Sequence, residues 1–66
     1  MEFSERLKEL REEKGVYQKD IAKAIGVATN TYCGYEKGTR EPNFQILKAI
    51  CRFYQVSSDY LLGLED

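Results

Sequence analysis

The feature that most constrains this fold is a glycine between two short helical patterns, in the stretch QKDIAKAIGVATNTYCGYEK. Ile21 and Ile25, before the glycine, lie four positions apart, and this spacing places both on one face of a helix. Tyr32 and Tyr35, after it, lie three positions apart and share a helical face in the same way. Because glycine adopts positive φ at little cost, Gly26 predicts a sharp turn between two helices.

The two helical patterns also share an apolar seam, which Val27 continues across the turn. Ala22 is small and leaves room for the second helix to cross closely over the first. Two helices crossed on a glycine turn form a helix-turn-helix, here from about residue 18 to residue 37. In such a motif the outer face of the second helix is free to enter a DNA major groove.

Length and composition predict one folded domain that spans residues 1–66. A chain this small buries only about 60% of its unfolded surface, so nearly every helix must contribute to a single core. The 42% hydrophobic and 32% charged content is ordinary for a folded protein. No apolar run approaches the ~20 residues of a membrane span, and the charged start MEFSERLKEL is unlike a signal peptide. We therefore expect a cytoplasmic protein without a membrane partner.

Metal, cofactor and enzyme chemistry have little support in the sequence. Cys33 and Cys51 are the only cysteines, and the chain contains no histidine, so a zinc site is disfavoured and both thiols are expected to be reduced. Acidic residues form no catalytic pair beyond the solvated Glu12 and Glu13, and no glycine-rich phosphate loop is present. We expect no catalysis, no cofactor and no small-molecule ligand in this domain.

The net charge of −1 and the pI near 5.4 argue weakly against nucleic acid as a partner. The distribution of the charges is more informative than their sum. Residues 15–42 contain four basic and three acidic side chains and are therefore net positive. This segment includes the whole predicted helix-turn-helix, so it gives a modest basic footprint.

Periodicity, caps and breakers predict an all-α domain with five short helices and no strand. The expected ranges are 3–14, 18–25, 29–36 and 44–54, and a last helix that begins after Ser57 and ends at Gly63. Asn43 is the expected N-cap of the fourth helix. The expected inner face of that helix consists of Phe44, Leu47, Ile50, Cys51 and Tyr54.

At this level the chain resembles the lambda-repressor-like family of helix-turn-helix proteins, the Cro and Xre-type repressors. The resemblance lies in RLKELREEKG, in the motif from Gln18 to Gly38, and in REPN and VSSDYLLG at their separations. It implies a compact five-helix domain whose third helix contacts double-stranded DNA in the major groove. It also implies a bacterial or phage regulator, most often a repressor, that acts at the nucleoid and binds a two-fold-related operator as a homodimer.

The resemblance assigns roles to individual positions. The base-contacting candidates are Gln18, Thr29, Asn30 and Gly34. Lys37, Thr39 and Arg40 match the loop that lies along the phosphates. Further candidates for the phosphates or the groove rim, outside that match, are Tyr17, Lys19, Thr31 and Cys33. Arg11 and Glu36 match an ion pair that joins the first helix to the end of the third. Independently of the resemblance, Asn suits bidentate contact with adenine and Thr suits contact with thymine. Thr29 and Asn30 are alternatively interpreted as residues that simply begin a helix.

Three residues depart from the family pattern. Tyr17 and Ala28 stand where Ser or Thr often caps the second and third helices, and a lost cap typically costs ~1 kcal/mol. Gly34 within the third helix costs about as much again relative to Ala. One explanation is an unusual DNA site, with a phosphate contact from Tyr17 and close backbone approach at Gly34. The alternative is weakened DNA recognition in an antitoxin-type or protein-interaction module.

Aromatic residues are numerous for so short a chain. The helical spacing of Tyr32, Tyr35, Tyr54 and Tyr60 favours the core or an interface over base stacking. Phe53 is expected to point partly outward, where it and Tyr60 are dimer-contact candidates.

The chain is interpreted either as a stand-alone regulator or as the DNA-binding part of a longer one.

Overall fold

The computed structural model describes residues 2–64, which form five helices and no strand. They are α1 (Phe3–Lys14), α2 (Gln18–Ile25), α3 (Thr29–Lys37), α4 (Phe44–Tyr54) and α5 (Ser58–Leu61). The all-α prediction is confirmed, and every helix begins at its predicted residue. α3 ends one residue later than predicted, at Lys37, and α5 ends at Leu61, before the predicted end at Gly63. Met1, Glu65 and Asp66 of the predicted domain lie outside the described residues.

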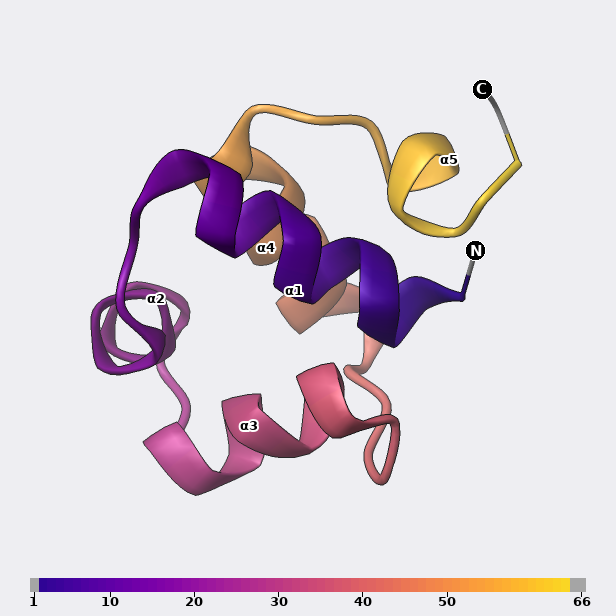
Figure 1. Cartoon of the computed structure of the whole chain (residues 1–66). Coiled ribbons are helices and arrows are strands. Elements are labelled where there is room, and N and C mark those ends of the chain that lie inside the picture. Colours follow the sequence, from indigo (N-terminus) through magenta and orange to yellow (C-terminus); the bar gives the residue numbers. More distant parts are fainter. Residues whose placement is uncertain (1, 65–66) are drawn as a thin grey trace.

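The helices pack around one core, with α1 in contact with α3, α4 and α5, and with α2 in contact with α3 and α4. In Figure 1, α1 crosses in front of α4, α3 lies below both, and α2 is viewed end-on at the left. The buried apolar residues come from all five helices: Leu7, Leu10, Ile21, Ala22, Ile25, Tyr32, Tyr35, Ile50, Tyr54 and Leu61. The predicted seam of the helix-turn-helix is thus the centre of the core.

The turn between α2 and α3 has the predicted conformation. Gly26 adopts φ 79°, and the N–H of Val27 donates to the carbonyl of Ala22 at 3.0 Å. This bond ends α2 and directs the chain away from its axis, so that α3 crosses it. Ala22 is 1% exposed, which agrees with its predicted place in the close crossing.

The prediction for Phe44 is wrong. Its side chain is 90% exposed, whereas Ile50 and Tyr54 of the same helix are buried. Phe44 is the first residue of α4, directly after its N-cap Asn43. Periodicity fixes the direction in which a side chain points, but a neighbouring element must be present to bury it.

Candidate nucleic-acid interface

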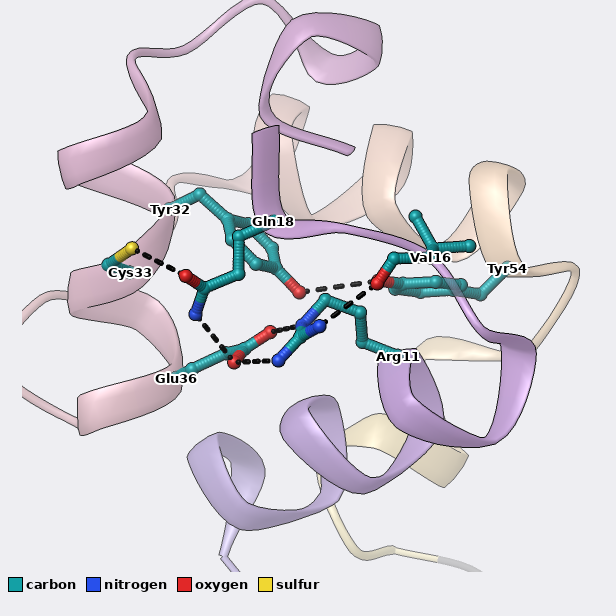
Figure 2. Close-up of polar contacts among 7 residues, drawn as sticks. All are labelled: Arg11, Val16, Gln18, Tyr32, Cys33, Glu36 and Tyr54. Atoms are coloured by element: carbon teal, nitrogen blue, oxygen red, sulfur yellow. Dashed lines mark hydrogen bonds and ion pairs between the residues drawn. The ribbon is translucent and has the colours of Figure 1, made fainter. Parts of the chain in front are cut away.

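A polar cluster between α1, α2 and α3 joins the three helices (Figure 2). The Arg11 guanidinium on α1 donates from Nε to one Glu36 oxygen at 2.6 Å and from Nη2 to the other at 3.3 Å. Its Nη1 donates to the carbonyl of Val16 at 2.9 Å, in the connection between α1 and α2. The Glu36 side chain is only 3% exposed, so the expected pair is a buried, bidentate link and not a surface contact.

Gln18, at the start of α2, belongs to the same cluster. Its Nε2 donates to Glu36 at 3.1 Å, and its Oε1 accepts from the Cys33 thiol at 3.1 Å. Figure 2 shows the side chain lying between α2 and α3 with both ends in use. Gln18 is therefore oriented before any ligand arrives, and Cys33 faces Gln18 at the rim of α3. This thiol–amide contact has no signal in the sequence.

The electrostatics of the cluster keep Glu36 charged. Burial by itself raises the pKa of Glu36, but hydrogen bonds from Arg11, Tyr32 and Gln18 outweigh burial and hold it below its ordinary value of 4.5. The hydrogen bond to Glu36 also raises the pKa of Arg11. Both partners are thus ionised at neutral pH, and the single acidic side chain of α3 is neutralised inside the protein.

A buried tyrosine pair lies beside this cluster and was not predicted as a pair. The hydroxyls of Tyr32 on α3 and Tyr54 on α4 lie 3.3 Å apart, and both side chains are at most 2% exposed. Burial raises the pKa of both hydroxyls, so both stay protonated at physiological pH. The requirement that a buried Tyr32 hydroxyl find a partner is met by Tyr54.

The N-terminal end of α3 is open. Ala28 occupies the N-cap with φ −67° and ψ 150° but provides no side-chain hydrogen bond, and Tyr17 likewise leaves α2 uncapped. Thr29 and Asn30 are exposed on the first turn, and Thr31 is half-buried. The first N–H groups of α3 therefore have no acceptor from the N-cap side chain, and Thr29 and Asn30 lie on the same turn.

Cationic and aromatic side chains are exposed at the start of α2 and after α3. Tyr17 is 70% exposed, and the Lys19 ammonium lies 5.9 Å from the centre of its ring. Lys37, Thr39 and Arg40 are exposed at the far end of α3 and in the loop that follows it. These rim candidates thus lie at the start of α2, at the C-terminal end of α3 and in the loop after it.

Gly34 differs from the expectation for a base-contacting position. It is buried, and the stem of Arg40 lies over it, so the glycine backbone is not open to close approach by a ligand. At this point of α3, the exposed side chain is that of Arg40 and not that of an α3 residue. The family resemblance assigned Gly34 to base contact but contained no information about the loop that returns across it.

Phe53 and Tyr60, the two dimer-contact candidates, lie in different surroundings. Phe53 is 39% exposed, as predicted, and packs edge-to-face on Tyr54. Tyr60 is half-buried, and the Arg6 guanidinium of α1 lies 4.7 Å from the centre of its ring. A dimer role for either residue stays a prediction.

Residues 2–64 were compared with the requirements of a metal site and of a membrane-spanning helix. These residues contain no group of three or more side chains of the types that could hold a metal ion. None of the described helices is long and apolar enough to cross a membrane.

Comparison with known proteins agrees with this geometry. A helix-turn-helix family model matches residues 7–61. The chain belongs to the helix-turn-helix family. It is 41% identical over 54 residues to the transcriptional repressor RstR of a Vibrio cholerae cryptic phage, covering 82% of this chain and 49% of RstR. It is 36% identical over 66 residues to the transcriptional activator BcrR of Enterococcus faecalis, covering 100% of this chain and 32% of BcrR.

Among solved structures, the P22 c2 repressor bound to a synthetic operator superposes with a TM-score of 0.92 at 29% identity, over 98% of each chain. The resemblance to lambda-repressor-like proteins is thereby confirmed, as is the five-helix fold. The chain spans about half the length of the first curated relatives it matches, between 49% and 57%.

Proposed function

We propose that this domain binds double-stranded DNA sequence-specifically, with α3 in the major groove, as part of a bacterial or phage transcription regulator. The observation that supports this most is the inward orientation of Glu36. The only carboxylate of α3 is turned into the protein and paired with Arg11, while Thr29 and Asn30 remain exposed on the outer side. The outer face of α3 thus offers hydrogen-bonding groups and cations to DNA and no negative charge.

Within this proposal the site residues have distinct roles. Asn30, Thr29 and the preoriented Gln18 contact base edges. Phosphates and the groove rim are contacted by Tyr17, Lys19, Thr31, Cys33, Lys37, Thr39 and Arg40. The uncapped N–H groups at the start of α3 add a dipole that favours a phosphate. We propose that the regulator acts as a repressor. It would act in the cytoplasm, at the nucleoid.

The test is a binding selection from a random-sequence duplex pool, followed by titration of the selected duplex at several salt concentrations. We expect recovery of a defined sequence and a steep fall in affinity between about 50 and 200 mM salt, because phosphate contacts release counterions. Binding that is absent, or that is indifferent to salt, would contradict the proposal and favour the protein-interaction alternative.

We also propose that the domain acts as a homodimer on a two-fold-related operator. Phe53 and Tyr60 are the predicted contacts, and the exposure of Phe44 adds a second apolar surface, with Leu62 and Leu64 also exposed. A selected sequence with two-fold symmetry would support the dimer. Loss of paired-site binding in Phe53→Ser but not in Phe44→Ser would assign the interface to Phe53, and the reverse would assign it to Phe44.

A further inference from the structure

The middle of α3 contains a glycine that the backbone does not require. Gly34 lies in the helix interior, and unlike Gly26 and Gly38 it does not adopt positive φ. Glycine is among the least favourable residues inside a helix, because it loses the most backbone freedom there. The reason for a glycine at this position therefore lies in its surroundings.

The side chain of Arg40 fills those surroundings. A Cβ built at position 34 would lie 2.9 Å from Cδ of Arg40, 3.0 Å from its Cγ and 3.2 Å from its Cβ. Movement of the guanidinium end alone would not relieve contacts with three consecutive stem carbons, one of which is attached to the backbone. The Arg40 stem thus lies across α3 in the space that any other side chain at position 34 would need.

Backbone hydrogen bonds hold the Arg40 backbone, from which this stem begins, against α3. The N–H of Arg40 donates to the Gly34 carbonyl at 3.2 Å, and the N–H of Thr39 donates to the same carbonyl at 3.0 Å. Gly34 therefore has two roles. Its carbonyl accepts hydrogen bonds from the loop, and its lack of a side chain leaves room for the Arg40 stem. Arg40 is exposed and forms no ion pair with any carboxylate in the described part of the chain, so its guanidinium is available to a ligand.

Gly34 also lies on the same side of α3 as the exposed contact candidates. It follows Asn30 by four residues and precedes Lys37 by three, and such spacings share a helical face. We propose that Gly34 is a positioning residue for Arg40, whose stem lies across α3 and whose guanidinium contacts paired acceptors of duplex DNA. Two phosphate oxygens, or O6 and N7 of guanine, both match the planar fork of arginine. The proposal rests on the proposed DNA-binding function.

A double-mutant cycle tests the coupling. The duplex selected by the wild-type protein is titrated with wild type, Gly34→Ala, Arg40→Ala and the double variant. We expect Arg40→Ala to weaken binding about tenfold. Gly34→Ala is expected to weaken it several-fold in the wild type and to have almost no effect when Arg40 is already alanine. Equal losses in both backgrounds, or no loss from Gly34→Ala, would overturn the positioning role.

Two further arms identify the acceptor. If Arg40 contacts phosphate, Arg40→Ala weakens binding to selected and unselected duplexes alike and reduces the salt slope by about 1. If it contacts guanine, the loss depends on one base pair, and Arg40→Lys does not restore binding because lysine lacks the fork. Either result, together with the coupling, supports the proposal.

A measurement on the free protein keeps this inference separate from the proposed function. Nuclear Overhauser contacts between the Gly34 α protons and the Arg40 methylene protons are expected in the wild type, and their absence would overturn the arrangement. A wild type that binds duplex DNA without the Gly34–Arg40 coupling refutes the positioning role alone. A wild type that binds no duplex refutes the DNA-binding proposal and, with it, the role of Arg40 at DNA.

Discussion

The two ends of α3 are held by different means. At its N-terminal end, Ala28 provides no cap, and Thr29 and Asn30 are exposed. At its C-terminal end, Glu36 is fixed by Arg11 through two hydrogen bonds, and the Gly34 carbonyl accepts two loop N–H groups. One end is thus open to solvent and the other is fastened to α1 and to the following loop.

The two ends of this nine-residue helix therefore differ in what they contribute to folding. The fastened end sets the position of α3 relative to the rest of the domain. The open end keeps unpaired backbone N–H groups and uncommitted side chains for a ligand. Substitution of Glu36 at the fastened end should therefore change stability, and substitution of the exposed Asn30 at the open end should change DNA binding.

Glu36→Ala is expected to have the largest effect. Removing one partner leaves Arg11 with an uncompensated charge in a partly buried site, which typically costs about 3–5 kcal/mol of unfolding free energy. Urea denaturation measures the loss. Glu13→Ala is the control, because Glu13 is exposed on α1. Equal destabilisation by the two variants would remove the distinction between the ends of α3.

Acid should weaken the fastened end by a smaller amount. The pKa of Glu36 is lowered in the folded protein, so its contribution to stability is present above the unfolded value of 4.5 and is lost as pH falls through the folded pKa. The effect is smaller than that of Glu36→Ala because protonated glutamate still fills its site. We expect Glu36→Gln to flatten the dependence of the urea midpoint on pH below 4.5. An unchanged acid limb in this variant would show that other carboxylates account for it.

Asn30→Ala probes the open end. A lost bidentate contact with adenine is expected to reduce discrimination against a wrong base by about 1–3 kcal/mol. Unfolding free energy should stay within about ±0.5 kcal/mol, because Asn30 is an exposed residue. Titrations with the selected duplex and with a single base-pair variant measure the discrimination. A stability loss without a change in selectivity would assign Asn30 to the fold.

Ala28→Ser is expected to give the smallest effect, and it should be stabilising. The extended backbone at Ala28 already suits an N-cap, so a serine hydroxyl can accept an N–H of the first turn and add ~1 kcal/mol. The melting temperature should rise by roughly 4–8 °C for a domain of this size. Ala24→Ser, at an exposed interior position of α2, is the matched control without a cap to fill. A gain no larger than that of the control would mean that α3 needs no cap.

Local patterns predicted the helices and their ends with little error. The signals come from residues that are close in sequence. They are apolar residues at helical spacing, glycines after helices, and caps such as Asn43. Asn43 accepts the N–H of Ile46 at 2.8 Å, as its place before α4 predicts. These signals suffice for helix ranges because helix formation depends on residues within one or two turns.

Contacts between distant residues were predicted less well. The Arg11–Glu36 pair came from a family resemblance, not from spacing, and the Gln18–Cys33 and Tyr32–Tyr54 contacts were not predicted. Each joins two helices whose mutual rotation no local pattern specifies. The same reason explains why the covering of Gly34 by Arg40 was missed.

The sequence by itself determined five amphipathic segments, a sharp turn at Gly26 and an apolar seam that only a helix-turn-helix packs efficiently. The tertiary structure decided which polar groups meet, which apolar side chain stays uncovered at Phe44, and what occupies the surface above Gly34. The physical reason is one of range. Backbone preference and periodicity act over a few residues, whereas the crossing of α1, α2 and α3 brings together side chains that lie up to 25 positions apart.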